Sequence, residues 1–170
     1  MALRPYQQAA FDTAVSWMKQ SIEPAVIEAA TGAGKSHIVA AIAEWVSINT
    51  GKKVLCLAPS KELTEQNHEK YLATGNPASF YSSSLGKSMA HDVVFGTPLT
   101  VKNSLDKFGA QFACIIVDEC HGITNTVQGI IGSIKEKNPK VRVIGLSATP
   151  YRLGSGYIYQ YVLPIVTGKQ

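Results

Sequence analysis

One seven-residue run constrains this chain more than any other: residues Ala30 to Ser36 read ATGAGKS. With Ala29 in place of the first glycine, the run fits the pattern G-x-x-x-x-G-K-[ST], a loop whose backbone N–H groups converge on phosphate oxygens. The strand-like run Ala25–Ala29 precedes the loop, and apolar residues at helical spacing follow it as far as Trp45. Such a loop joins a buried strand to the N-terminus of a helix, so it predicts an α/β fold.

The residues of this loop have separate expected roles. Gly32 and Gly34 lack a Cβ, so the backbone can turn tightly and approach a ligand closely. Lys35 is expected to reach the β- and γ-phosphates of a nucleoside triphosphate, and Ser36 to offer its hydroxyl to Mg²⁺. A plain glycine-rich turn is the alternative, but it does not require a Lys-Ser pair in this register. The predicted nucleotide-binding residues of the loop are Thr31, Gly32, Ala33, Gly34, Lys35 and Ser36.

A second run, IIVDECH at Ile115 to His121, contains two acidic residues. The segment Phe112–Val117 is continuously apolar, as expected for a strand that is covered on both faces. Asp118 and Glu119 would then emerge at the carboxyl end of this strand, where open α/β sheets bind ligands. We expect Asp118 to hold Mg²⁺ through water, and Glu119 to orient and deprotonate an attacking water. Two solvated carboxylates at a strand end are the alternative, which the phosphate loop disfavours.

The composition is that of a globular domain. The 170 residues suffice for one domain with a sizeable core, and a charged fraction of 16% argues against disorder. The net charge of +4 suits a polyanionic partner without requiring one. Cys56, Cys114 and Cys120 lack C-x-x-C spacing, so we expect reduced thiols and an intracellular, cytoplasmic protein. No stretch of the sequence approaches a membrane span.

Strand-like and helix-like segments alternate along the chain. This alternation implies parallel βαβ units with right-handed crossovers, and so a mostly parallel sheet with helices on its faces. The expected helices cover residues 5–19, 35–50, 60–72, 97–107 and 124–137. The expected strands cover residues 25–29, 54–58, 79–83, 91–95, 112–117 and 141–146, and the tail 151–170 has room for a final strand.

Four further segments resemble helicase motifs, in the order in which that family has them. LRPYQQ at 3–8 resembles the glutamine motif, LAPSKELTEQ at 57–66 motif Ia, GTPLT at 96–100 motif Ib, and SATP at 147–150 motif III. ATGAGKS then resembles motif I, and DECH resembles motif II. Over nearly its whole length, the chain resembles the first RecA-like domain of a superfamily 2 helicase. Within that superfamily it looks most like the bacterial RadD type of DNA repair helicase.

The resemblance implies a fold, cofactors and a partner. The implied fold is a RecA-like P-loop NTPase, a three-layer sandwich with a mostly parallel central sheet. The implied cofactors are ATP and Mg²⁺, with Gln7 as the residue that reads adenine and Arg4 beside it. The implied partner is DNA, single-stranded or branched, because this superfamily contains motors that move on nucleic acid.

Motifs Ia and Ib would lie just beyond strand ends, where helix N-termini and loop N–H groups meet phosphates. Helix capping by Ser60 and Thr97 is an alternative that is compatible with phosphate contact. Ser147 and Thr149 are expected to link the acidic motif to DNA-induced movement, with turn capping as the alternative. His121 is expected to connect the nucleotide site with a domain interface. The candidate nucleic-acid contacts are Pro59, Ser60, Lys61, Gly96 and Thr97.

The sequence departs from the family in one respect. The family's engine holds ATP between two RecA-like domains, and the second domain supplies motifs IV to VI with their arginine fingers. No segment of residues 1–170 resembles those motifs, so we expect a single ATP-binding domain that lacks its second RecA-like partner. Met1 and the ending Thr167 to Gln170 favour a piece of a longer chain over a single-domain remnant. The isolated domain is therefore expected to be nearly inactive as an ATPase.

The sequence as a whole predicts the N-terminal ATP-binding domain of a DNA-dependent ATPase, a helicase or translocase that acts in DNA repair. One alternative is the motor subunit of a type I or type III restriction enzyme, which a nuclease domain elsewhere in the protein would identify. Another is a module that binds nucleotide or partner proteins without turnover. A small-molecule kinase is more distant, because kinases do not need the SATP and LAPSKELTEQ segments.

Overall fold

The computed structural model describes residues 3–29, 34–119 and 125–147, together with the backbone of residues 161–163. The helices are α1 (Pro5–Gln20), α2 (Lys35–Thr50), α3 (Lys61–Leu72), α4 (Pro98–Lys102) and α5 (Asn125–Lys137), with a 3-10 turn at Leu105–Lys107. The strands are β1 (Ala25–Glu28), β2 (Lys53–Leu57), β3 (Ser79–Ser82), β4 (Gly86–Lys87), β5 (Val93–Gly96), β6 (Phe112–Asp118), β7 (Arg142–Ser147) and β8 (Tyr161–Leu163).

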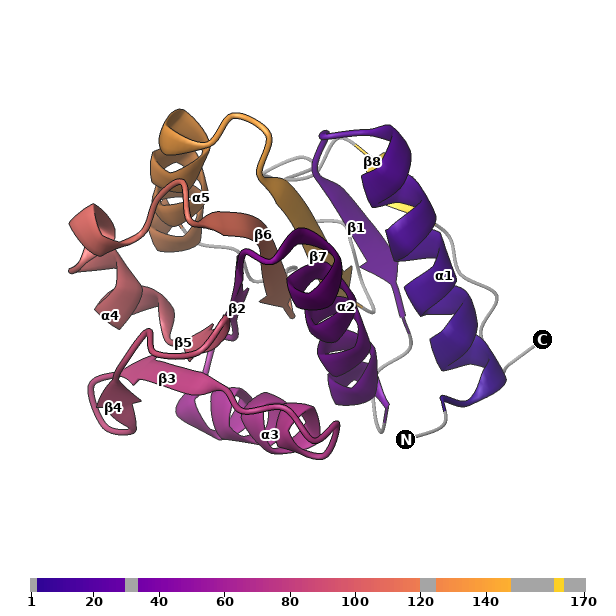
Figure 1. Cartoon of the computed structure of the whole chain (residues 1–170), viewed down its shortest axis with the longest axis horizontal. Coiled ribbons are helices and arrows are strands. Elements are labelled where there is room, and N and C mark those ends of the chain that lie inside the picture. Colours follow the sequence, from indigo (N-terminus) through magenta and orange to yellow (C-terminus); the bar gives the residue numbers. More distant parts are fainter. Residues whose placement is uncertain (1–2, 30–33, 120–124, 148–160, 164–170) are drawn as a thin grey trace.

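The strands form one sheet in the order β4-β3-β5-β2-β6-β7-β1-β8 (Figure 1). Every pair of neighbours is parallel except β3 and β4. The predicted α/β fold with a mostly parallel sheet is therefore confirmed. The carboxyl ends of β1, β7, β6, β2 and β5 consequently share one edge of the sheet.

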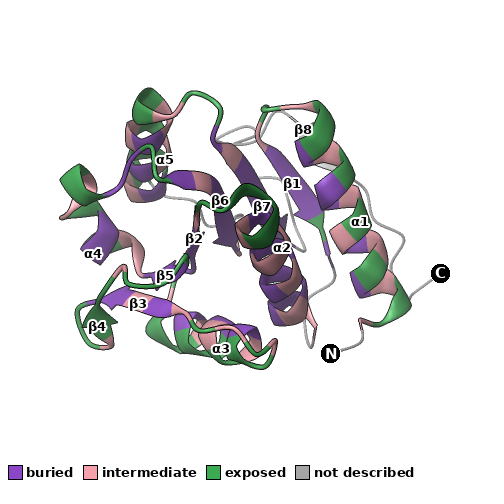
Figure 2. Cartoon of the chain, viewed as in Figure 1, coloured by how far each residue is buried: buried purple, intermediate pink, exposed green. Residues whose placement is uncertain are grey.

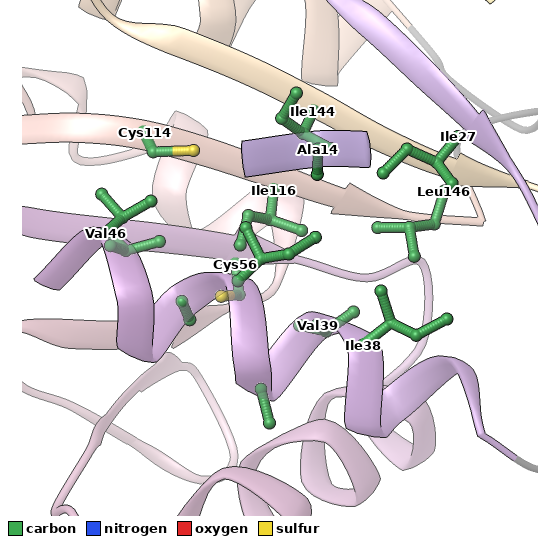
Figure 3. Packing of buried hydrophobic residues seen from close by; sticks show 14 of the residues in the cluster. Ala14, Ile27, Ile38, Val39, Val46, Cys56, Cys114, Ile116, Ile144 and Leu146 are labelled. Carbon is green, nitrogen blue, oxygen red and sulfur yellow. The ribbon is translucent and has the colours of Figure 1, made fainter. Parts of the chain in front are cut away.

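Side chains alternate along the strands between two separate apolar clusters. Ile27 and Ile116 face the cluster that lies under α1, α2 and α3, whereas Val26 and Ile115 face the cluster under α4 and α5. Figure 3 shows the first cluster, in which Ile38 of α2 lies across from the strands. In Figure 2 the central strands are buried while the outer turns of α1 and α3 are exposed. The molecule therefore has three layers, with the sheet in the middle.

Local signals account for most helix ends. Ser60 caps α3, since its side chain accepts a hydrogen bond from the backbone N–H of Leu63 at 3.1 Å. Gly51 ends α2 in the left-handed region at a φ of 65°, as glycine favours. Thr97 is at the expected N-cap position of α4, but its hydroxyl donates to Thr100 Oγ1 at 3.1 Å instead of capping the backbone.

The structure differs from the sequence prediction at two segments. The helix expected over residues 97–107 ends at Lys102, and a separate 3-10 turn follows it. The two-residue strand β4 was not predicted, because it is too short to carry an alternating pattern. The final strand expected in the tail is present at residues 161–163, where β8 pairs in parallel with β1, and the other residues of the tail lie outside the described ones.

Two of the three cysteines are described. Cys56 and Cys114 are buried free thiols, and Cys120 lies outside the described residues. Burial raises the pKa of Cys114 to about 12, so this thiol stays protonated at neutral pH. Among the described helices, none combines the length and apolar character that a bilayer crossing requires.

The two isoleucines near the middle and end of α2 test its register. Ile42 is fully buried and Ile48 is 70% exposed. Ile42→Ala should lower the free energy of unfolding by about 2–5 kcal/mol, because it leaves a cavity in the core. Ile48→Ala should change it by less than about 0.5 kcal/mol. Urea denaturation of both variants measures this, and equal losses would contradict the placement of α2.

Candidate nucleotide-binding site

The last residue of the predicted phosphate loop, Gly34, lies against the first turn of α1. Gly34 has a φ of 119°, a conformation that side chains rarely adopt. A Cβ at this position would collide with the hydroxyl of Tyr6 and crowd the side-chain amide of Gln7. Lys35 and Ser36, the first residues of α2, follow at 7% and 5% exposure. Only a glycine therefore fits at the point where α1 meets the loop; residues Thr31, Gly32 and Ala33 lie outside the described part of the chain.

Lys35 faces both acidic residues of the second motif. Its Nζ forms an ion pair with Glu119 Oε1 and lies 3.4 Å from Asp118 Oδ1. Asp118 is 2% exposed and Glu119 is 24% exposed. A buried ammonium with two carboxylates has its charge compensated, whereas any one of the three alone would be costly to bury.

The backbone turns sharply between the two carboxylates. Asp118 is the last residue of β6, and Glu119 follows at a φ of 55°, in the left-handed region that non-glycine residues seldom occupy. The N–H of Glu119 donates to Asp118 Oδ1 at 2.9 Å. Strained backbone of this kind tends to occur at functional sites, where the surrounding structure holds it.

Asn67 of α3 joins the two motifs and was missed by the sequence analysis. Ser36 Oγ donates to Asn67 Oδ1 at 2.7 Å, and Asn67 Nδ2 donates to Asp118 Oδ2 at 3.0 Å. Thr64, Asn67 and Tyr71 are the buried residues of α3, at spacings of three and four. A polar amide on the inner face of a predicted helix was the signal that could have identified it.

Gln7, the expected adenine reader, contacts the loop through its amide nitrogen and the N-cap of α1 through its amide oxygen. Its Oε1 accepts from the backbone N–H of Arg4 at 2.7 Å, and its Nε2 donates to the carbonyl of Gly34 at 3.2 Å. Gln7 is buried and Arg4 is exposed. A primary amide has two N–H groups and two acceptor positions, and the described residues use one of each.

His37 follows Ser36 in α2, and the sequence analysis gave it no role. Its Nδ1 is buried without a hydrogen-bond partner among the described residues. Burial lowers the pKa of His37, and the positive charges of Lys70 and Arg4 lower it further. The imidazole is therefore neutral at pH 7.

The candidate nucleic-acid contacts lie at or just beyond the ends of β2 and β5. Pro59 and Lys61 are exposed, and Ser60 and Thr97 are half-buried. Gly96 is buried, and a Cβ there would lie 2.7 Å from Val101 Cγ2, so glycine lets α4 pack closely. A hollow of about 380 Å³ is lined by Pro59 and Thr97, by Asp118 and Glu119, and by the exposed Leu99.

Of the three candidate coupling residues, only Ser147 is described. It ends β7 and is fully buried, and its carbonyl accepts from the N–H of Ala29 at 2.9 Å. This bond ties β7 to the segment from which the phosphate loop starts. His121 and Thr149 lie outside the described residues.

The donor set of the site fits a magnesium ion. The hydroxyl of Ser36 and the carboxylate of Asp118 are oxygen donors, which Mg²⁺ prefers, and one amide links them. Among the described residues there is no group of three or more His, Cys, Asp or Glu side chains that could hold a transition metal. Mg²⁺ is typically bound by one or two protein oxygens together with substrate phosphates, as this small donor set requires.

Comparison with known proteins places the chain among helicases and restriction enzymes. It is 29% identical over 160 residues to the ATP-dependent DNA helicase uvsW of Enterobacteria phage T4. The match covers 85% of this chain and 31% of uvsW, so the chain spans about a third of that relative's length. Nothing in this match supports the finer expectation of the RadD type.

Solved structures share the fold. The UvsW helicase of bacteriophage T4 matches 96% of this chain and 60% of its own chain, at a TM-score of 0.74 and 23% identity. The Hef helicase domain of Pyrococcus furiosus matches 98% of this chain and 38% of its own, at a TM-score of 0.76 and 23% identity. The Type ISP restriction-modification enzyme LlaGI was solved with a DNA substrate mimic. It matches 98% of this chain and 20% of its own chain, at a TM-score of 0.71 and 20% identity. These likenesses confirm the RecA-like architecture.

One family model matches residues 1–152 of the chain's 170. The matched range contains motifs I, Ia, Ib, II and III. It also contains Asn67 and the two residues that Asn67 links, Ser36 and Asp118. The chain therefore belongs to the family described as type III restriction enzyme, res subunit, and it shares its fold with the helicase structures above.

Proposed function

We propose that this chain is the ATP-binding domain of a DNA-dependent ATPase, a helicase or translocase that uses ATP and Mg²⁺. One observation carries the proposal: Lys35 contacts Asp118 and Glu119, while Ser36 is linked to Asp118 through Asn67. Residues from two distant motifs thus meet at the carboxyl edge of the sheet, where α/β folds bind ligands. Family membership and the likeness to an ATP-dependent DNA helicase support the same function.

Each residue of the cluster has a proposed role. Lys35 exchanges its carboxylate partners for the β- and γ-phosphates of the nucleotide, and the loop N–H groups hold the remaining phosphate oxygens. Ser36 and Asp118 hold Mg²⁺, which neutralises charge on the phosphates when bound. Glu119 orients the attacking water and accepts its proton.

DNA is the proposed partner, single-stranded or branched. Support comes from the net charge of +4 and from the exposed Lys61 beside the N-terminus of α3, where backbone N–H groups favour phosphate. A repair role of the RadD type and a cytoplasmic location remain predictions. The family description favours a second candidate, the motor subunit of a type I or type III restriction enzyme.

A second RecA-like domain in cis is part of the proposal. The chain covers only about a third of uvsW, which leaves room for such a domain in a full-length protein. Among the described arginines, Arg142 is at the amino end of β7, where it donates to the carbonyls of Met18 at 3.1 Å and Lys140 at 2.8 Å. It is therefore held at the edge opposite the site. Arg4 lies on the Gln7 side of the site, and Arg152, which follows SATP, lies outside the described residues. The proposed arginine finger comes from the second domain.

Nucleotide binding tests the role of Lys35. Lys35→Ala removes the charge that faces the β- and γ-phosphates, so the affinity for ATP·Mg²⁺ should fall roughly 10- to 100-fold. Lys52→Ala, at an exposed lysine just after α2, is the matched control and should bind as the wild type does. Isothermal calorimetry measures both. Equal affinities of the wild type and Lys35→Ala would exclude the assignment of the loop.

Base selectivity tests the role of Gln7. Its amide donor and acceptor match the adenine edge, so the domain should bind ATP more tightly than GTP, and Gln7→Ala should erase this preference. Because Gln7 also holds Gly34, the variant can weaken both nucleotides, and the ratio of the two affinities is the informative quantity. Gln8→Ala is the control at the neighbouring exposed glutamine. A wild type that binds ATP and GTP equally would count against the role.

Steady-state ATP hydrolysis tests the need for a second domain. An arginine finger contributes roughly 10³–10⁵ in rate in related enzymes, so residues 1–170 should hydrolyse ATP very slowly. Single-stranded DNA should not stimulate the reaction, because stimulation requires two domains to close on the nucleotide. Robust DNA-stimulated hydrolysis that Glu119→Gln abolishes would show that this domain is a complete motor.

A further inference from the structure

We infer that Asn67 is a positioning residue that orients both candidate magnesium ligands, Ser36 and Asp118. The inference rests on the proposed nucleotide site and extends it to a residue on a third element, α3. The three side chains come from α2, α3 and β6, and all three are buried, with Asn67 1% exposed. The bridge between the two ligands is therefore shielded from bulk water.

The chemistry of the three groups determines the direction of both hydrogen bonds. An ionised carboxylate only accepts, so the amide nitrogen of Asn67 must face Asp118, at 3.0 Å from Oδ2. The amide oxygen then faces Ser36, and it also only accepts, so the serine hydroxyl must donate its proton to it, at 2.7 Å. The orientation of the amide is thus fixed by its two partners.

This direction suits a serine that binds a metal. A neutral hydroxyl has one proton and two lone pairs, and a metal ion needs a lone pair. Because the Ser36 hydroxyl donates its hydrogen bond to Asn67, the lone pairs of its oxygen are left for a cation. Hydrogen bonds from groups behind the ligands are a general way in which proteins orient metal ligands, and their loss typically weakens metal affinity 10- to 100-fold.

Asn67 also holds Asp118 independently of Lys35. Asp118 Oδ1 accepts from the N–H of Glu119 and faces Lys35 Nζ, while Oδ2 accepts from Asn67. When Lys35 turns to the phosphates, Asp118 loses its nearest cation, but the amide and the backbone N–H keep both oxygens in place. Asn67 is neutral, so it adds no charge that would compete with the metal.

Metal binding to the nucleotide complex tests the inference. In Asn67→Leu, a side chain of similar size makes neither hydrogen bond. A nucleotide titration in EDTA should give an affinity close to that of the wild type, because the contacts of Asn67 are to Ser36 and Asp118. Mn²⁺, added to protein saturated with a non-hydrolysable ATP analogue, should bind roughly 10- to 100-fold more weakly than in the wild type. The electron paramagnetic resonance signal of free Mn²⁺, corrected for binding by the analogue alone, reports this affinity.

Two further variants separate a metal effect from a loss of stability. Ile134→Val shortens a buried side chain near the end of α5, far from the carboxyl edge, and should keep the wild-type Mn²⁺ affinity. Asn67→Ala replaces Asn67→Leu if the leucine variant does not fold by circular dichroism, because it removes the amide without adding an apolar branch. Its expected loss of Mn²⁺ affinity is the same.

Two results would overturn the inference, and a third, distinguishable from them, would refute the proposed function. Wild-type Mn²⁺ affinity in a folded Asn67 variant would exclude a positioning role. A loss of nucleotide affinity in EDTA as large as the loss of Mn²⁺ affinity would show that Asn67 only supports the fold. A wild type that binds no nucleotide at all would instead refute the proposed function on which the inference rests.

Discussion

The parallel register of β6, β7 and β1 is the constraint on which the site depends. Ile116 of β6 pairs with Ile144 of β7, and Ile144 pairs in turn with Ala25 of β1. This register brings the carboxyl ends of three strands to one edge, so that the start of α2 meets the end of β6. A slip of one residue would turn every side chain of a strand to the opposite face, and it would remove Asp118 from Lys35. The two apolar clusters specify the register, because each accepts only alternate residues.

Sequence analysis predicted the fold correctly, and it predicted residues that the structure brings together, because their signals are local. The continuous apolar run before Asp118 predicted a strand buried on both faces, and the Lys-Ser pair after two glycines predicted the loop and its helix. The end of the helix after Thr97 and the two-residue strand β4 were not predictable, since neither has a pattern longer than a few residues. Asn67 was missed for another reason: its importance comes from two partners on other elements, Ser36 and Asp118.

The cluster around Lys35 buries charged groups, which costs desolvation free energy, and the fold tolerates it. A lysine at 7% exposure and an aspartate at 2% exposure are tolerated because each is beside an opposite charge or an oriented amide. The arrangement adds little net stability compared with apolar packing, since desolvation offsets most of the attraction. The left-handed backbone of Glu119 adds a further cost at the same place. Stability comes mainly from the two apolar clusters, which leaves the carboxyl edge available for chemistry.

Helix α3 is a rigid connection between two parts of the molecule. Its capping residue Ser60 lies beside the exposed Pro59 and Lys61, and its inner face carries Asn67 into the acidic cluster. Asn67 is six residues along the helix from Lys61, a rise of about 9 Å, and so short a segment does not bend appreciably. An axial shift of a few tenths of an ångström at the capped end is therefore transmitted to the amide, where hydrogen bonds of 2.7 and 3.0 Å leave little slack.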